Sequence, residues 1–251
     1  MAGGGSTRVR VALGSLGNNG PMAQPTTPLP DMLNQIANSA DPEQSLQQFQ
    51  AELTRFRLEY DCGMEEVATK IGNLQREFDR THQYKPIEHV KTRLKSMESL
   101  VAKARRLDCH DLVEVREQIR DVAGIRVVCT FVEDIYRVAD MLVQQPDITL
   151  LTRKDYVANP KASGYQSLHL IVSVPVYLSD RSIEVPVEIQ LRTIAMDFWA
   201  SLEHQIHYKY DGQVPEPLRM ELREVADSAA VLDRQMGRLR DEVRSLGPTQ
   251  G

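Results

Sequence analysis

Residues 183–193 read IEVPVEIQLRT, and this stretch decides the fold class. Apolar side chains alternate with charged, amide or proline residues along it, which predicts a β-strand with one buried face. The other face lines up Glu188, Gln190 and Arg192, and it is either the solvated side of a sheet or one wall of a site. Because Pro186 cannot donate a ladder hydrogen bond, the strand is expected to have an edge or a bulge there.

Other β-rich segments lie upstream of this strand. They span residues 125–131, 148–153 and 167–174, and a helix-like segment at 134–143 separates the first two. After Thr193 the pattern is helical through Tyr210. Together with the flanking helices described next, this order predicts an α+β fold with one sheet between N- and C-terminal helices.

Apolar periodicity predicts the flanking helices. Steps of three and four residues give two helices over 46–60 and 67–78, with Gly63 as the expected break, and a third over 89–106. Beyond Pro217 the apolar residues keep heptad spacing for about four repeats. This C-terminal seam needs a partner helix, either in the same chain or in another subunit.

Composition narrows the class of protein. The 251 residues are 41% hydrophobic and 26% charged, with a formal net charge of -5, which argues against a general nucleic-acid or membrane coat. The three cysteines lack metal-ligand spacing, and no apolar run approaches the roughly 18 residues of a membrane span. Residues 1–43 have the composition of a disordered arm. The prediction is a cytoplasmic protein with one domain over 44–251.

The stretch KASGYQSLH, residues 161–169, reads as a loop that turns into a strand. By strand parity Tyr165, Ser167 and His169 share one face, and Lys161 approaches across the turn. A tyrosine ring can stack on a base, and lysine and histidine can contact phosphates or hydroxyls. Taken singly, however, a tyrosine and a histidine often only cap a hydrophobic core.

A row of cations marks the helix expected at 89–106. Lys95, Ser99, Lys103 and Arg106 fall within an arc of about 80° at 100° per residue. Such a row either binds a polyphosphate or is a solvated basic face. Arg93 falls outside the arc, so the helix is expected to start after it and leave this guanidinium free.

Asp121 lies in RDVAGIRVVCTF, residues 120–131, at the entrance of the strand that carries Arg126. Its carboxylate either holds Mg²⁺ together with phosphate oxygens or forms an ordinary surface pair with an arginine. Taken together, the clusters supply two carboxylates, cations on separate elements and a stacking aromatic, which suit phosphoryl-type transfer between two nucleotides. P-loop, dinucleotide-binding and protein-kinase motifs are absent. Glu203, His204 and His207 lack further metal ligands nearby, so packing is preferred for them.

Several motifs together resemble the RelA/SpoT synthetase domain in order and spacing, over about residues 45–245. They are VKTRLKSMES (90–99), RDVAGIRVVCTFVEDIY (120–136), KASGYQSLH and VEIQLRTIAMDFWASLEHQIHYKY (187–210). The AMDFW segment is similar to that of small alarmone synthetases. The resemblance implies a mixed sheet of the nucleotidyltransferase-like fold. It also implies transfer of the β,γ-pyrophosphate of ATP to the 3′-hydroxyl of GDP or GTP, with GMP as a further candidate acceptor, Mg²⁺ as cofactor and a homotetramer.

The resemblance also assigns the site residues. It makes Asp121 and Glu188 the catalytic and Mg²⁺-binding carboxylates, with Glu188 taking the proton of the 3′-hydroxyl. ATP binding falls to Arg93 and Arg126, which sandwich the adenine, and to Lys95, Ser99, Lys103 and Arg106 at the phosphates. GDP or GTP binding falls to Tyr165 stacking on guanine, to Lys154, Lys161 and His169 near the phosphates, and to Gln190 beside the guanosine.

Three departures from the family pattern qualify this assignment. Lys154 replaces an arginine of many relatives, which leaves the preferred acceptor open. In the cleft where one group of relatives binds its activating alarmone, His89 stands for a phenylalanine and Asp197 for an asparagine. An aspartate facing that ligand would repel phosphates, so pppGpp is not expected to stimulate this protein.

Two further predictions concern hydrolase activity and a non-catalytic alternative. The dipeptide His110-Asp111 lies inside the synthetase region, and Asp111 is interpreted as a helix cap, so no hydrolase activity is expected. The alternative function is a non-catalytic module that binds alarmone or RNA. Retention of both Asp121 and Glu188 counts against it, because a mere binder does not need a pair of metal-binding carboxylates.

Overall fold

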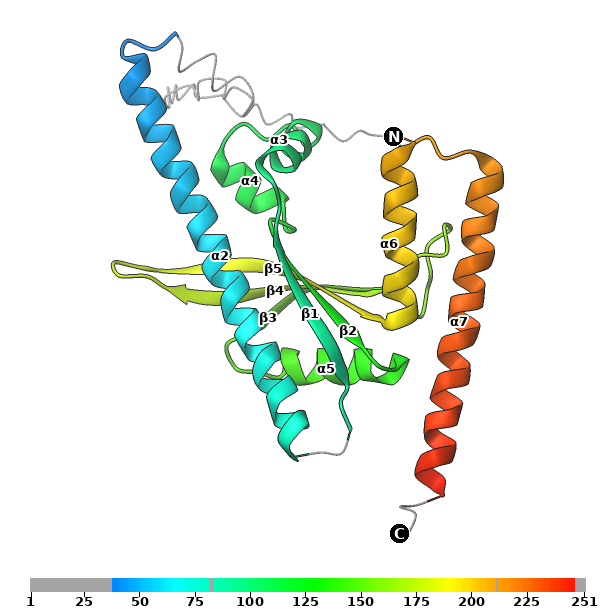
Figure 1. The fold of residues 1–251 in the computed structure, drawn as a ribbon. Coiled ribbons are helices and arrows are strands. Elements are labelled where there is room, and N and C mark those ends of the chain that lie inside the picture. The colour runs from blue at the N-terminus through cyan, green and yellow to red at the C-terminus, as the bar shows by residue number, and fades with distance from the viewer. Residues whose placement is uncertain (1–37, 82–83, 211, 247–251) are drawn as a thin grey trace, which may run out of the picture.

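The computed structural model describes residues 38–81, 84–210 and 212–246. A five-stranded sheet with the order β1-β2-β5-β4-β3 lies at its centre (Figure 1). The strands are β1 (Ile87–Leu94), β2 (Ala123–Cys129), β3 (Thr149–Asp155), β4 (Leu168–Tyr177) and β5 (Ser182–Thr193). β2 and β5 pair in parallel and the other neighbours pair antiparallel. The predicted α+β class with a mixed sheet is confirmed.

Helices surround this sheet. They are α2 (Pro42–Thr81), α3 (Met97–Arg106), α4 (Leu112–Gln118), α5 (Val132–Val143), α6 (Ile194–Lys209) and α7 (Glu216–Ser245). α2 and α5 contact several strands, whereas α6 follows directly from β5 and lies beside α7 (Figure 1). None of the helices among the described residues is long and apolar enough to cross a membrane.

Strand parity divides the sheet into an apolar face and a polar face. Ile125 of β2 and Ile189 of β5 are buried in the core, together with residues of α2 and α5. Arg126 and Glu188, their neighbours in sequence, point to the opposite face. This polar surface of the sheet is called the site face below.

Pro186 lies at an edge position, as predicted. β5 pairs with β4 along its length, but its pairing with β2 begins only at Val187. At Pro186 the strand therefore has a partner on one side only. The missing N–H removes no hydrogen bond from the β2–β5 ladder, and the register with β4 continues through this residue without a bulge.

The N-terminal helix is continuous where the sequence predicted two helices separated at Gly63. α2 runs for 40 residues and buries Tyr60, Val67 and Ile71. A Cβ added at Gly63 would lie 2.5 Å from Cγ1 of Val185 in β5. The glycine allows the helix to approach the sheet closely, and it does not end the helix.

The predicted disordered arm falls largely outside the described residues. Of residues 1–43, only 38–43 are described, and α2 begins at Pro42 within that range. The remainder of the arm stays a prediction.

The segment 89–106, predicted as a helix that starts after Arg93, is a strand followed by a shorter helix, so the late start is confirmed and the strand before it was missed. β1 occupies the edge of the sheet, and α3 begins after Ser96, whose Oγ accepts a hydrogen bond from the backbone N–H of Ser99 at 3.3 Å. In β1, Lys91 and Arg93 alternate with the partly buried Val90, which is a period of two. This period was hard to see because the partly buried Val90 and Leu94 are four residues apart, which also fits a helix.

α7 packs only the first part of its apolar seam against the described chain. Leu222 and Ala226 are buried against Trp199 and Ala200 of α6. Later seam positions are between 46% and 78% exposed, namely Leu232, Met236, Leu239, Val243 and Leu246. The seam therefore finds its predicted partner within the chain for its first turns, and its later part is not covered by the described residues.

Candidate active site

Two rows of side chains cross the site face in strand register. The first row takes one residue from each strand: Lys91 pairs with Arg126, then follow Gln190, His169 and Lys154. Residues directly opposite each other on neighbouring strands place their side chains on the same face. The row therefore carries three cations, an amide and an imidazole across the whole sheet.

The second row lies two residues away along the strands. Arg93 of β1 pairs with Gly124, Gly124 pairs with Glu188, and Glu188 pairs with Ile171. Glu188 is on β5, the central strand of the sheet. Because Gly124 has no side chain, the surface between Arg93 and Glu188 stays open.

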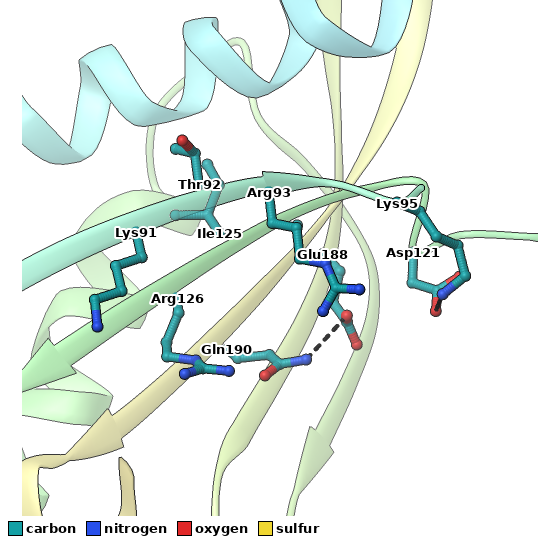
Figure 2. Close-up of a pocket in the computed structure, with 10 residues that line it drawn as sticks. Lys91, Thr92, Arg93, Lys95, Asp121, Ile125, Arg126, Glu188 and Gln190 are labelled. Atoms are coloured by element: carbon teal, nitrogen blue, oxygen red, sulfur yellow. Dashed lines mark hydrogen bonds and ion pairs between the residues drawn. The ribbon is translucent and has the colours of Figure 1, made fainter. Parts of the chain in front are cut away.

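A cavity of about 420 Å³ lies over one half of the site face (Figure 2). It is lined by Lys91, Thr92, Arg93, Lys95, Asp121, Gly124, Ile125, Arg126, Glu188 and Gln190. Four of these side chains are cationic and two are carboxylates. Such a lining suits an anion bound together with a divalent cation.

A smaller cavity of about 250 Å³ lies over the other half. Its lining residues are Thr152, Lys154, Tyr156, Lys161, His169, Ile171 and Glu188. The ammonium group of Lys161 lies 4.7 Å from the ring centroids of both Tyr156 and Tyr165. Glu188 borders both cavities, so its carboxylate lies where the two spaces meet.

Asp121 is held by two lysines. Its Oδ2 accepts a hydrogen bond from Lys95 Nζ at 3.0 Å, and its Oδ1 accepts one from Lys103 Nζ at 2.8 Å. Burial alone raises the pKa of Asp121, but these hydrogen bonds outweigh it and the pKa lies below its usual value. The carboxylate is therefore ionised at neutral pH. The alternative interpretation of Asp121, a surface ion pair with an arginine, is not seen: among the described residues its ion-pair partners are the two lysines.

The predicted row of phosphate-binding residues is divided. Lys95 precedes α3 and lines the larger cavity, whereas Lys103 reaches it only through Asp121. Ser99 Oγ accepts a hydrogen bond from Ser96 Oγ at 2.9 Å near the start of α3 and is not part of the cavity lining. Arg106, at the end of α3, is exposed and also lies outside that lining.

Glu188 is hydrogen-bonded through both carboxylate oxygens. His169 Nδ1 lies 3.2 Å from Oε1, and Gln190 Nε2 donates to Oε2 at 3.0 Å (Figure 2 shows the second bond). Burial raises the pKa of Glu188, but the interactions with His169 and Gln190 outweigh it and leave the pKa below its usual value. Glu188 is thus an oriented carboxylate, ionised at neutral pH.

The loop before β4 brings Tyr165 to His169 but turns Ser167 away. The Tyr165 hydroxyl lies 2.7 Å from His169 Nε2. Ser167 is fully buried, and its Oγ donates to the carbonyl oxygen of Leu191 at 3.1 Å. The expectation that all three residues share one face is wrong at Ser167, because β4 begins only at Leu168 and strand parity does not extend into the loop.

Asp197 has partners inside the chain. Its Oδ1 lies 3.1 Å from Arg126 Nη1 and 3.3 Å from Arg192 Nη1. The two guanidinium groups balance its charge, so Asp197 is no longer expected to repel a polyphosphate effector. The expectation that pppGpp does not stimulate the protein then depends on His89 alone.

Three residues next to the site had no predicted role in it, namely Arg192, Tyr156 and Asp197, although Asp197 was expected in the cleft of the activating alarmone. Arg192 continues the parity of Glu188 and Gln190, so its place on the polar face was visible in the strand pattern. Tyr156 follows β3 directly after Lys154 and Asp155, and this position beside a cation was the only available signal. The pairing of Asp197 with Arg126 depends on tertiary packing of α6 and has no local signal.

Histidines and acids outside the site face do not gather into a metal centre. No group of three His, Cys, Asp or Glu side chains suited to a metal occurs among the described residues. Asp111 caps α4, as predicted, by accepting a hydrogen bond from the Glu114 backbone N–H at 2.8 Å. His207 lies 3.8 Å from Glu203 within α6 and, like His204, is exposed, so neither histidine packs in the core.

Known proteins share this fold and these motifs. Residues 92–213 match the family described as a region found in RelA/SpoT proteins. GTP pyrophosphokinase YwaC of Bacillus subtilis (strain 168) is 46% identical over 187 residues, which are 74% of this chain and 89% of YwaC.

Solved structures agree with this match. Small alarmone synthetase 1 from Bacillus subtilis, bound to its product pppGpp, has a TM-score of 0.72 at 38% identity and covers 76% of this chain and 98% of that chain. Small alarmone synthetase 2 from the same organism has a TM-score of 0.68 at 45% identity, covering 74% and 97%.

The mixed sheet, with two adjoining cavities on its polar face, defines a synthetase-type nucleotide domain. Sequence identity and the shared fold over nearly the whole length of these relatives make the assignment more specific. The chain belongs to the RelA/SpoT family, among the small alarmone synthetases.

Proposed function

We propose that this protein is a (p)ppGpp synthetase, which transfers the β,γ-pyrophosphate of ATP to the 3′-hydroxyl of GDP or GTP. The observation that carries the proposal is that Glu188 borders both cavities. Transfer between two nucleotides needs one place where the acceptor hydroxyl meets the donor phosphate. Two relatives support the same reaction: YwaC is named a GTP pyrophosphokinase, and small alarmone synthetase 1 was solved with its product pppGpp bound.

The larger cavity is the proposed ATP site. Its volume of about 420 Å³ is within the usual range for small-molecule sites. Arg93 and Arg126 lie on neighbouring strands along its wall, and planar guanidinium groups can stack on both sides of a base. Lys95 lies at the Asp121 end of the cavity, where its charge can meet phosphate oxygens.

The smaller cavity, with the loop beside it, is the proposed GDP or GTP site. Tyr165 lies in that loop and not in the cavity lining, and its ring, which the Lys161 ammonium now covers at 4.7 Å, is the proposed stacking surface for guanine. Lys154 and His169 pair across β3 and β4 and border the cavity, so both can contact acceptor phosphates. Gln190 lines the larger cavity and not this one, so its contact with the guanosine stays a prediction from the family pattern.

In the proposed reaction the 3′-oxygen of the acceptor attacks the β-phosphorus of ATP. A new P–O bond forms, the bond to the oxygen bridging the α- and β-phosphorus breaks, and AMP leaves. Glu188 accepts the proton of the 3′-hydroxyl. Because the pKa of Glu188 is lowered, it is a weak base. Its contribution is an ionised carboxylate held in a fixed direction at the reacting hydroxyl.

Mg²⁺ is the proposed cofactor, and the residues present fit it. Asp121 and Glu188 border the same cavity and are ionised, oxygen-bearing ligands. Mg²⁺ usually binds through one or two protein carboxylates and completes its shell with phosphate and water oxygens. When bound, it would neutralise charge on the pyrophosphate being transferred.

ATP labelled at the γ-phosphate tests the proposed function directly. Incubation with Mg²⁺ and GMP, GDP or GTP in turn should give a labelled guanosine product and an equal amount of AMP. The three acceptors are thereby ranked, and omission of Mg²⁺ should stop the reaction. Binding of both nucleotides without any labelled product would instead identify a non-catalytic module.

A homo-oligomer, with a tetramer as the expected form, is part of the same proposal. The exposed apolar side chains of α7 support it, as do Ile194 and Phe198 of α6, which are 54% and 68% exposed. Apolar surface of this extent on two adjacent helices is typical of a contact surface between subunits. A cytoplasmic setting is also proposed, because ATP and guanine nucleotides are the substrates.

A further inference from the structure

Arg192 and Asp197 form a buried ion pair next to the site face. Arg192 is 4% exposed and Asp197 is 9% exposed. Arg192 Nη1 lies 3.3 Å from Asp197 Oδ1, and neither residue lines the two cavities described above. Removing two charges from water is unfavourable unless they are well paired. The role of this buried pair is indicated by its further contacts with residues of the site.

One chain of hydrogen bonds runs from Arg192 to Oε1 of Glu188. Arg192 Nη2 donates to the Tyr165 hydroxyl oxygen at 2.6 Å, and this hydroxyl lies 2.7 Å from His169 Nε2. His169 Nδ1 then lies 3.2 Å from Glu188 Oε1. A guanidinium only donates, so the Tyr165 oxygen accepts from Arg192, and the ionised Glu188 accepts from Nδ1 of His169.

A second chain runs from the same nitrogen to the other oxygen of Glu188. Arg192 Nη2 donates to Gln190 Oε1 at 2.8 Å. With that oxygen engaged, the amide of Gln190 turns its Nε2 toward Glu188 Oε2, to which it donates at 3.0 Å. The two chains therefore start at one guanidinium nitrogen and end at the two oxygens of one carboxylate.

Asp197 connects this arrangement to the other cavity. The Oδ1 atom that binds Arg192 also lies 3.1 Å from Nη1 of Arg126, which lines the larger cavity. Arg126 is thus held by a carboxylate on α6, and Tyr165 is held by the arginine paired with the same carboxylate. The proposed adenine-stacking and guanine-stacking side chains share one buried anchor.

We propose that Arg192 and Asp197 are positioning residues that orient Glu188 and couple the two nucleotide sites. The inference rests on the proposed function, because it takes Arg126 as part of the ATP site and Tyr165 as part of the acceptor site. A nucleotide that orders Arg126 also orders Asp197 and Arg192, and through them Tyr165. The second nucleotide then meets a side chain that is already in place, so each nucleotide strengthens binding of the other.

Steady-state kinetics of Asp197→Asn test the orienting role. The amide is isosteric but uncharged, so it holds the two guanidinium groups weakly. Loss of such a supporting partner typically lowers activity about 10- to 100-fold, and the loss should appear in kcat as well as in KM. Asp233→Asn is the matched control. Asp233 of α7 accepts a hydrogen bond at 2.7 Å from the hydroxyl of Thr193, which caps α6, the helix that carries Asp197. That control should keep kcat.

Arg192→Lys tests whether Arg192 orients Glu188 or only stabilises the fold. Lysine keeps the charge that Asp197 needs, but its single nitrogen cannot occupy both the position of Nη1, which faces Asp197, and that of Nη2, which serves Tyr165 and Gln190. The variant should keep its circular dichroism spectrum and show a kcat reduced about as much as Asp197→Asn. A normal kcat in a folded Arg192→Lys protein would overturn the orienting role.

Equilibrium binding tests the coupling. The affinity for α,β-methylene ATP is measured with Mg²⁺, with and without saturating GDP, in the unaltered protein and in Asp197→Asn. GDP should tighten binding of the analogue several-fold in the unaltered protein, and the ratio should fall to about one in the variant. A ratio near one in the unaltered protein, or an unchanged ratio in the variant, would overturn the coupling.

These outcomes are distinct from failure of the proposed function. If the unaltered protein binds each nucleotide alone and makes labelled product, the proposed function stands. The ratio of analogue affinities with and without GDP then tests the coupling alone. If the unaltered protein binds neither nucleotide, both are overturned.

Discussion

At the scale of single residues, the proposed chemistry depends most directly on Glu188. Glu188→Gln removes the proton acceptor without changing the size of the side chain. We expect kcat to fall by at least about 100-fold, which is the lower range for a general base. The melting temperature should change little, because the side chain lies on the polar face and not in the core.

Glu184→Gln is the control for this variant. Glu184 lies on the same strand and accepts a hydrogen bond from Ser173 Oγ at 2.7 Å, away from both cavities. Its amide variant should turn over normally. Normal turnover by Glu188→Gln at neutral pH would remove Glu188 from the mechanism.

Tyr165 and Arg126 allow the two nucleotide sites to be tested separately. Tyr165→Ala should weaken GDP binding by about 1–3 kcal/mol, the usual size of base stacking on an aromatic ring, with a smaller effect on ATP. Arg126→Ala should do the reverse. Calorimetric titration of each variant with each nucleotide measures both effects. Equal losses for both ligands in both variants would mean that the two stacking residues are wrongly assigned.

Strand parity predicted much of the site at this scale. It placed Glu188 and Gln190 on one face of β5 and His169 on the same face of β4, and the structure joins them by hydrogen bonds. Parity could not reveal the Arg192–Asp197 pair, because Asp197 lies on a helix whose direction relative to β5 depends on packing. It also failed at Ser167, where the strand has not yet begun.

At the scale of elements, Gly63 determines how closely α2 approaches the sheet. Gly63→Ala would place a methyl group 2.5 Å from Cγ1 of Val185, and such overpacking destabilises proteins by about 1–3 kcal/mol. Gly72→Ala is the matched control on the same helix, since a Cβ there meets nothing within 4 Å. The control should stabilise the protein by about 0.5–1 kcal/mol.

Urea unfolding of the two variants measures this difference. If both substitutions stabilise the protein equally, the close contact between α2 and β5 is absent in solution. Opposite signs would confirm that Gly63 is a packing residue within a continuous helix, as the structure shows.

The loop that carries Lys161 and Tyr165 depends on α7. Gly164 has φ +92°, and an added Cβ would lie 2.5 Å from Cβ of Ala226, while Arg223 Nη1 donates to the Ala162 carbonyl at 2.7 Å. Gly164→Ala therefore strains the loop by roughly 1–2 kcal/mol from the backbone alone. We expect KM for GDP to rise more than KM for ATP. An equal rise for both would show that the loop does not serve the acceptor site specifically.

Element types were largely predictable, and their pairing was not. The β-rich segments and the terminal helices follow from local periodicity, whereas the order β1-β2-β5-β4-β3 joins strands far apart in sequence. β1 was included in a predicted helix because its partly buried apolar residues, Val90 and Leu94, are four residues apart, a spacing that also fits a helix. Its pairing with β2 resolves the ambiguity, and no local pattern contains that information.

At the scale of the whole molecule, a chain with a negative net charge still lines both of its site cavities with more cations than acids. The formal net charge is -5, yet lysines and arginines dominate the charged lining of both cavities. A local basic surface of this kind attracts polyphosphates without making the protein a general nucleic-acid binder. The same placement explains why the composition excluded broad function classes but did not point to the site.

The exposed part of α7 gives the last prediction, which concerns assembly. Leu232 and Leu239 are 51% and 54% exposed on a helix whose first turns are already packed on α6. A free apolar seam favours association with another copy of the chain. Light scattering at micromolar concentration should therefore give a mass several times that of the 28.4 kDa chain, with four copies as the expected number.

Charges placed in the seam test which surface is responsible. Leu232→Glu combined with Leu239→Glu should reduce the mass, because each carboxylate would be buried without a partner in the contact. Arg238→Glu adds a carboxylate to the same helix outside the seam and should leave the mass unchanged. A monomeric unaltered protein would contradict the prediction of assembly. An oligomer that survives the double substitution would show that the subunits meet through another surface, for which Ile194 and Phe198 of α6 are the exposed alternatives.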